Sequence, residues 1–261
     1  METAEITYSA SALWGYGLET VFCLCWPLFL FFFLRKKFGG FKVRPLVIGF
    51  GTYFAVSLVR AVFRALVLTD GVREIPALFY FLSALLSGVL EELGRYLALK
   101  YALDGFDGFR DAFSYGIGHG GCEMMLGIMP VALTQLYRGL RCNKVGVAVM
   151  TAGLDPDRAA AFAKKLAEGA DHSFLYSLIT VISWIVPMHC ALSVLVLISV
   201  HYVGQKKLLY AAMGIHIFID ILPPLVVWLK VPLPMTTVAA AEILIILYIR
   251  RIWKRMNEDG A

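Results

Sequence analysis

The stretch LLSGVLEELGRYLALKY, residues 85–101, sets the fold class, because two adjacent glutamates and an arginine interrupt a segment otherwise apolar enough for a lipid bilayer. Ionisable groups inside a membrane span are costly and usually functional. On a helix, Glu91 and Arg95 lie one turn apart, while Glu92 is rotated by about 100° from Glu91. One glutamate can therefore pair with Arg95 while the other stays free. The alternative is a structural ion pair that only fixes helix packing.

The composition places the rest of the chain in the membrane as well. Of the 261 residues, 59% are hydrophobic and 16% are charged, which is too apolar for a soluble domain. The formal net charge of +5 does not indicate nucleic acid, because the basic residues cluster in short segments beside apolar runs. These segments indicate topology, and the expected surroundings are the lipid bilayer.

Apolar segments predict an all-α polytopic bundle of about seven transmembrane helices. They cover about residues 14–34, 45–68, 76–101, 112–137, 174–200, 208–228 and 238–248. The loop of residues 35–44 is strongly basic, so the positive-inside rule places it in the cytoplasm. We therefore expect a multi-pass protein of the cell membrane, with its N-terminus outside and its C-terminus in the cytoplasm. Residues 1–261 are expected to form a single integral-membrane domain.

Two further features concern packing. The long polar connection at about residues 138–172 is expected to contain a short amphipathic surface helix after Asp155 and Pro156. The span at 112–137 is rich in glycine and should approach its neighbours closely.

Histidines and carboxylates recur inside the predicted spans. His119 with Glu123, and His216 with Asp220, lie one turn apart on their helices, and His189 stands alone in the span at 174–200. At about 1.5 Å per residue, the three histidines and Glu91 all lie roughly 10–20 Å from the predicted cytoplasmic ends of their helices. Such a convergence can bind a metal or activate a water, and helix packing alone seldom requires it.

Three other intramembrane charges, Glu19, Arg60 and Arg64, have no histidine nearby. For them we expect mutual pairing or snorkelling towards the membrane surface.

These motifs resemble those of the YhfC-type intramembrane metalloproteases, which are allied to the superfamily of CAAX prenyl endopeptidases and bacterial abortive-infection proteins. The superfamily's glutamate pair and arginine are matched by Glu91, Glu92 and Arg95, with the arginine one position earlier than in the prenyl endopeptidases. Its aromatic residue followed four positions later by histidine is matched by Tyr115 and His119, and the YhfC-like extension GHGGCE ends at Glu123.

Two more motifs complete the resemblance. A histidine followed four residues later by asparagine or aspartate is matched by His216 and Asp220, and the segment MHCALSVLVL resembles a further block that contains His189. This block is commonly preceded by a Glu-Arg pair, whereas Ser183 and Trp184 occupy the region in this chain.

The resemblance implies an endopeptidase in which Glu91 or Glu92 activates water. In one version His119, His189 and His216 hold a divalent metal, most plausibly zinc, with Glu123 and Asp220 as outer partners or an extra ligand. In the other no metal is present: the glutamate and His119 polarise water, and His216 with Asp220 stabilises the oxyanion. The third histidine favours the metal, although the HExxH signature is absent.

The implied substrate is a membrane-embedded or membrane-associated peptide, cut within or near the cytoplasmic membrane boundary at a site that opens towards the cytoplasm. Two alternatives come from other classes. Intramembrane carboxylates and histidines also form relays in proton- or ion-coupled transporters, although no inverted repeat is visible. The chain could also be a catalytically silent membrane scaffold or immunity protein that retains the site residues.

Overall fold

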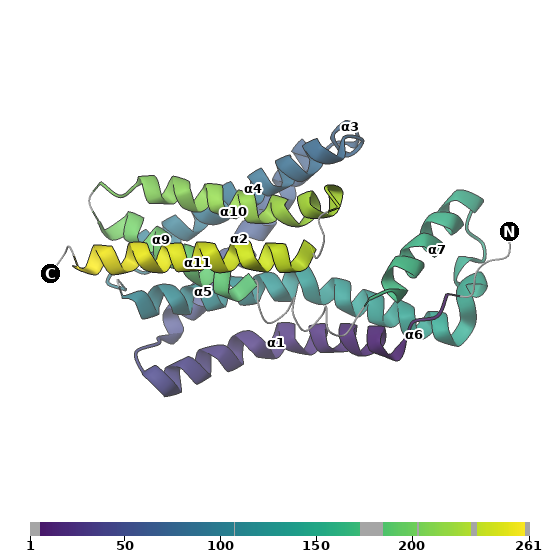
Figure 1. Ribbon diagram of the computed structural model, residues 1–261, viewed down its shortest axis with the longest axis horizontal. Coiled ribbons are helices and arrows are strands. Elements are labelled where there is room, and N and C mark those ends of the chain that lie inside the picture. The colour runs from purple at the N-terminus through teal and green to yellow at the C-terminus, as the bar shows by residue number, and fades with distance from the viewer. Residues whose placement is uncertain (1–5, 107, 173–184, 203, 231–233, 259–261) are drawn as a thin grey trace. The chain divides into compact units, whose positions relative to one another are not determined.

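The computed structural model describes residues 6–106, 108–172, 185–202, 204–230 and 234–258. Every regular element within these ranges is helical and none is a strand, which confirms the all-α class. The helices, labelled in Figure 1 where there is room, are α1 (Ala10–Phe38), α2 (Val43–Val67), α3 (Asp70–Arg73), α4 (Pro76–Leu97), α5 (Phe109–Glu123), α6 (Met129–Thr151), α7 (Pro156–Ala170), α9 (Ile185–His201), α10 (Lys207–Trp228) and α11 (Pro234–Glu258). Two π-helical segments, η1 (Ala98–Ala102) and η2 (Met124–Ile128), follow α4 and α5 directly.

Several of these helices have the length and composition of membrane spans. Within the described residues, four such candidates are found: Ala10–Phe38, Val43–Val67, Pro76–Ala102 and Lys207–Val226. The apolar helix α9 is shorter, and residues 174–184 of the span predicted at 174–200 lie outside the described residues, with Ser183 and Trp184 among them. The fold is that of an all-α membrane helix bundle.

The chain forms two compact units, one made of residues 1–26 and 124–183 and the other of residues 27–123 and 184–261. In the first unit, Tyr8 and Tyr16 belong to a buried cluster with Leu166 of α7. Glu19 lies 3.2 Å from His172 in the same unit, so the expectation that Glu19 has no histidine partner was wrong.

The connection predicted to become polar at about residue 138 is instead helical as far as Thr151, where α6 ends. The helix continues because Cys142 and Val147 are buried in the same cluster as Tyr8. A break occurs at Gly146, whose φ of 76° lies in the left-handed region that glycine adopts without steric cost.

The expected amphipathic helix is confirmed as α7. Asp155 is its N-cap, and its side chain accepts a hydrogen bond of 3.0 Å from the backbone N–H of Arg158. Leu166 is buried on its apolar face, and Pro156 occupies the first turn, where its missing N–H is not needed.

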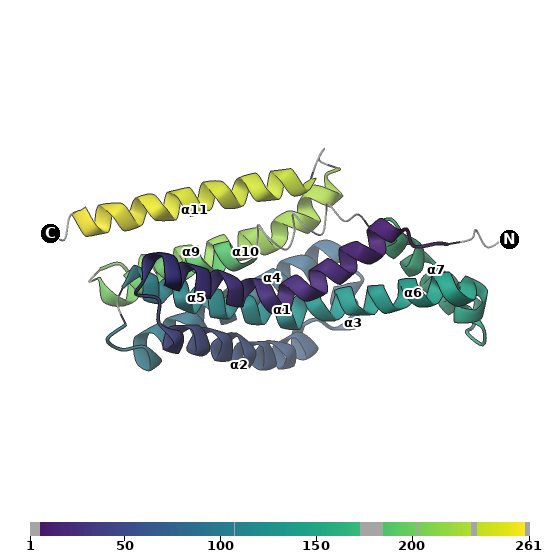
Figure 2. The same cartoon turned by 90° about the horizontal axis from the view of Figure 1, so that it is seen from below.

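The second unit brings α2, α4, α5, α9, α10 and α11 together. Helix α5 packs against α2 and α9, while α4 packs against α10 and α2. Figure 2 shows α11 on one side of this unit, where it contacts α9 and α10. Helix α5 is therefore enclosed by two neighbours, and α4 lies between α2 and α10.

Glycines on α5 allow these helices to approach closely, as expected from the sequence. A Cβ on Gly118 would overlap the carbonyl oxygen of Leu46 in α2, and a Cβ on Gly116 would overlap the backbone of Cys190 in α9. Gly127 differs, because a Cβ there would have no neighbour within 4 Å. The distance between α5 and its two neighbours thus depends on the absence of side chains at residues 116 and 118.

We predict that Gly118→Ala lowers the free energy of unfolding by roughly 1–3 kcal/mol, because the methyl group must displace the backbone of α2. Gly127→Ala is the matched control and should be neutral or stabilising, since alanine favours a helix and meets open space. The measurement is the thermal midpoint of both variants in detergent. Equal stability of Gly118→Ala and the wild-type protein would contradict the close packing of α2 on α5.

Candidate active site

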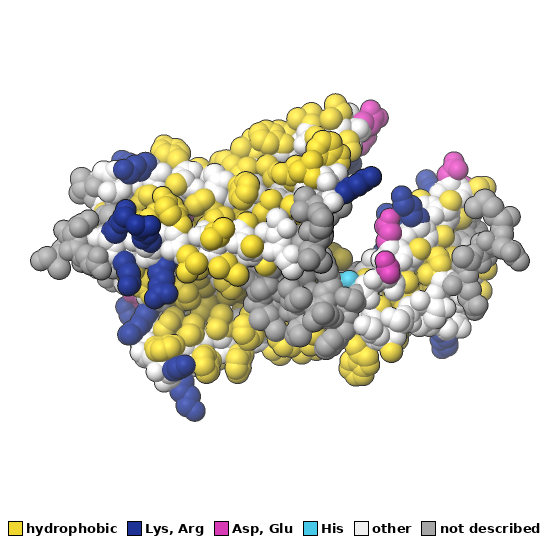
Figure 3. All heavy atoms as spheres, in the orientation of Figure 1, with side chains coloured by type: hydrophobic (Ala, Val, Ile, Leu, Met, Phe, Trp, Pro, Cys, Tyr) yellow, Lys and Arg dark blue, Asp and Glu magenta, His cyan; other side chains and the backbone are white. Residues whose placement is uncertain are grey.

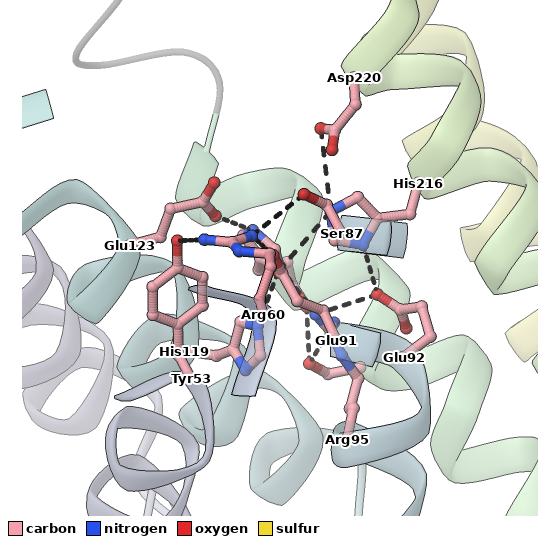
Figure 4. A network of polar contacts seen from close by, with 12 residues as sticks. Tyr53, Arg60, Ser87, Glu91, Glu92, Arg95, His119, Glu123, His216 and Asp220 are labelled. Atoms are coloured by element: carbon pink, nitrogen blue, oxygen red, sulfur yellow. Dashed lines mark hydrogen bonds and ion pairs between the residues drawn. The ribbon is translucent and has the colours of Figure 1, made fainter. Parts of the chain in front are cut away.

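The second unit contains a buried polar cluster that unites all the predicted site residues (Figure 4). They come from four helices: Glu91, Glu92 and Arg95 from α4, His119 and Glu123 from α5, His189 from α9, and His216 and Asp220 from α10. The close approach of α5 to α9 and of α4 to α10 brings these side chains within contact distance.

Glu91 lies at the centre of the cluster and is almost completely buried. Its Oε2 is 3.3 Å from Nε2 of His119 and 3.7 Å from Nε2 of His216. Its Oε1 is paired with the guanidinium of Arg60 from α2. A buried carboxylate needs such a cation, because its desolvation is otherwise uncompensated.

Glu92 faces a different set of partners. Its Oε1 lies 3.2 Å from Nη2 of Arg95 and 2.7 Å from Nδ1 of His216. Since a carboxylate accepts hydrogen bonds, Nδ1 of His216 donates to Glu92, while Nε2 lies towards Glu91. Glu92 thus orients His216 as outer carboxylates orient histidines in metal and acid–base sites.

Arg95 is fully buried and fixes His189. Its Nη1 donates to the backbone oxygen of His189 at 2.8 Å and to Oγ of Ser193 at 3.0 Å, and its Nη2 contacts Nδ1 of His189 at 2.7 Å. A guanidinium can only donate, so Nδ1 of His189 accepts and Nε2 carries the proton, which it donates to Glu123.

His119 completes the cluster from α5. Its ring packs edge-on against Tyr53, with 5.1 Å between the ring centroids. Among the described residues, Nδ1 of His119 and Oε2 of Glu92 are buried without a hydrogen-bond partner. Buried polar atoms of this kind commonly hold a water or ligand.

Several residues of the cluster were not predicted from the sequence. Arg60 reaches Glu91, donates to Oγ of Ser87 at 3.1 Å, and donates to the hydroxyl of Tyr53 at 2.9 Å. The expectation that Arg60 pairs with another isolated charge or snorkels was therefore wrong. The cost of an arginine inside a membrane span was the signal that could have identified it.

The cluster contains a candidate set of metal ligands. One ligand atom each from Glu91, His189 and His216 can be chosen so that all lie within 4.8 Å of one another. His216 has the orientation of a ligand, whereas His189 would first have to give up the proton on Nε2 and its contact with Arg95. The trio is a candidate metal site whose ligand atoms would have to move closer together around an ion. His119 contacts Glu91 but is outside the trio.

The exposure of the cluster changes along the helices. Glu123, Asp220 and Arg60 have side chains that are 24%, 32% and 15% exposed, while Glu92 and Arg95 are fully buried. Glu123 and Asp220 each lie one turn beyond a site histidine, on helices that begin near the basic residues of the loops.

In the other direction the neighbouring side chains are buried. Leu99, Leu103 and Tyr115 are fully buried between the cluster and the basic end of the unit. Dark-blue side chains mark this end of the molecule, near the C-terminus, in Figure 3. The more exposed members of the cluster therefore lie on the side away from the basic end.

The fold and the site define a polytopic membrane protein with a buried centre of carboxylates and imidazoles. The chain matches the model of the YhfC intramembrane metalloprotease family over residues 22–244 and belongs to this family. It is also similar to the uncharacterized membrane protein YhfC of Bacillus subtilis (strain 168), with 26% identity over 106 residues. That match covers 38% of this chain and 41% of the relative, so the similarity spans less than half of the relative's length. No solved structure matches the chain.

We predict that Arg60→Met lowers the free energy of unfolding by about 3–5 kcal/mol, because it leaves the buried carboxylate of Glu91 without its cation. Arg64→Met, one turn further along α2, is the control and should change stability by less than about 1 kcal/mol. Denaturation of both variants in detergent provides the comparison. Equally small effects of the two substitutions would contradict the pairing of Arg60 with Glu91.

We also predict that Asp220→Cys reacts with a water-soluble thiol reagent only from the side opposite the basic loops. The assay uses sealed proteoliposomes and a background in which the exposed Cys25 is replaced, since the other cysteines are buried. Cysteine at Ser199, which is buried in α9 nearer the basic end, should stay unlabelled from both sides. Labelling of position 220 from the basic side would reverse the direction of opening.

Proposed function

We propose that this protein is an intramembrane endopeptidase in which Glu91 activates a water molecule. The observation that carries the proposal is the position of the Glu91 carboxylate, held by Arg60 and facing His119 and His216 at hydrogen-bonding or near-contact distances. Membership of a family described as intramembrane metalloproteases supports the same reaction class.

In the proposed reaction, Glu91 accepts a proton from a water molecule, and the oxygen of that water attacks the scissile carbonyl carbon. His119 lies beside the same carboxylate and orients that water. This is the version without a metal: His216, held by Glu92 and 3.9 Å from Asp220, carries protons on both ring nitrogens, and its Nε2–H donates to the oxyanion. The proton on Glu91 then passes to the leaving nitrogen, the C–N bond breaks, and the products are a carboxylate and an amine.

We propose a second version of the site, in which zinc would be held by Glu91, His189 and His216, so that Glu91 is a ligand there and not the base. When bound, it would supply a Lewis acid that polarises the scissile carbonyl. The sequence allows a wider ligand set, with His119 and Glu123 in addition, and these residues would then complete or surround the same centre. Arg95 takes part as the group that sets the tautomer of His189.

The expected place of cleavage follows from the depth of Glu91. Ala102 lies eleven positions after Glu91, which corresponds to about 16 Å of helix. With the basic end in the cytoplasm, the N-terminus outside and the C-terminus inside, we propose that membrane-embedded peptides are cut inside the membrane, towards the cytoplasmic boundary. Residues 1–261 would then form a single peptidase domain of the cell membrane.

The kinship with the CAAX prenyl endopeptidases and bacterial abortive-infection proteins also belongs to this proposal, and it rests on the glutamate pair, on His119 and on the pair His216 and Asp220. A proton-coupled transporter and a silent scaffold remain the competing functions. Both predict that membranes with and without an intact Glu91 have the same protein termini.

We predict that Glu91→Gln abolishes the formation of new termini while the protein stays folded, because the amide cannot act as a base but keeps the hydrogen-bonding size of the side chain. Glu92→Gln should mainly lower stability, since it weakens the pair with Arg95. Glu242→Gln, which changes a buried glutamate of α11 outside the cluster, is the control.

The measurement is quantitative mass spectrometry of new peptide termini in membranes from cells that express each variant in place of the wild-type protein. Termini that persist in Glu91→Gln membranes would assign the cleavage to another enzyme. Equal, mild losses from Glu91→Gln and Glu92→Gln would contradict the division of roles.

We predict further that purified protein binds close to one equivalent of divalent metal and that His216→Gln and Glu91→Gln lower this occupancy markedly. His119→Gln should lower it little, because His119 is outside the trio, and His172→Gln in the first unit is the control. Metal content by elemental mass spectrometry gives the answer directly. Cleavage that survives a strong chelator would eliminate zinc and leave the peptidase.

A further inference from the structure

A groove on the second unit is lined by none of the residues of the polar cluster and has a different character. It has a volume of about 430 Å³ and runs between α5, α9 and α11. This is within the range of roughly 300–1,000 Å³ that is usual for small-molecule sites. Aliphatic and aromatic side chains line most of it, including Phe113, Val194 and Ile246.

One end of the groove is cationic. Arg250 and Lys254 line it, and they lie one turn apart on α11, beyond Ile246 towards the C-terminus. Both are exposed, and among the side chains that the structure describes neither has an ion-pair partner. Figure 3 shows basic side chains gathered at this end of the molecule, beside a hydrophobic surface.

Trp253, which lies between Arg250 and Lys254 in the sequence, also lines the groove. The centroid of its ring is 5.3 Å from that of Phe109 in α5. Tryptophan side chains favour the level of the lipid headgroups, where one part of the ring is apolar and the N–H is polar. The apolar part of the groove therefore belongs to the hydrocarbon region, and Arg250 and Lys254 belong to the headgroup region.

We propose that this groove binds a phospholipid with an anionic headgroup. An acyl chain lies along Phe113, Val194 and Ile246, and the phosphate lies between Arg250 and Lys254. The arrangement accounts for a division among the four cations of α11: Arg250 and Lys254 line the groove, while Arg251 and Arg255 lie on the same turns but do not. A general membrane-surface attraction would use all four alike.

The test uses the fluorescence of Trp253 in liposomes that contain brominated phosphatidylglycerol or brominated phosphatidylcholine at equal mole fraction. The signal of Trp253 is the difference between each protein and its Trp253→Phe counterpart. The anionic lipid should quench Trp253 more strongly than the zwitterionic lipid in the wild-type protein. Arg250→Ala with Lys254→Ala should weaken apparent binding by roughly thirtyfold, because each cation near a membrane surface contributes about a fivefold gain.

The matched control is Arg251→Ala with Arg255→Ala, which removes the same charge from the same helix and should retain the preference. Equal quenching by both lipids in the wild-type protein would overturn the site. Equal loss in the two double variants would also overturn it, in favour of a general electrostatic attraction. A dimer detected by native mass spectrometry, whose formation abolishes the preference, would assign the groove to a second copy of the chain instead.

Discussion

The neutralisation of two neighbouring buried carboxylates is the constraint on which the second unit depends. Glu91 and Glu92 are adjacent on α4, and neither can be ionised in a low-dielectric interior without a cation and hydrogen-bond donors. The structure supplies a separate arginine for each, Arg60 from α2 for Glu91 and Arg95 from α4 itself for Glu92. Because adjacent helical residues face different directions, the two carboxylates lie at different nitrogens of His216, and Glu91 also faces His119. One is therefore available for chemistry, while the other supports His216.

Helix packing places these partners within reach. Arg60 and His189 come from helices that contact α5 at Gly118 and Gly116, where no side chain separates the backbones. A larger separation would withdraw either the cation of Glu91 or the imidazole beside Glu123. The glycines thus affect the site by setting the distance between the helices, without contacting the side chains of the site. A polar cluster is tolerated inside a membrane bundle because its charges compensate one another.

The sequence predicted most of the site and less of its surroundings. Charge inside apolar spans, helical spacing and a common depth identified the glutamates and the histidines, and the structure places them together. Arg60 was misinterpreted because spacing along one helix does not show which face of α2 meets α4. The extension of α6 to Thr151 was not predicted, because the polar residues of this segment indicated a loop although one face of the helix is buried.

Oxygen-18 labelling tests the role of Glu91 most directly. Purified protein and extracted membrane substrate are combined in water enriched in oxygen-18 under single-turnover conditions, and the product and the peptide containing Glu91 are analysed by mass spectrometry. Direct attack of a water activated by Glu91 places one heavy oxygen in the new carboxyl terminus and none in the Glu91 side chain. Heavy oxygen in Glu91 would show that this carboxylate attacks the substrate itself, and a product without heavy oxygen would show that water is not the nucleophile.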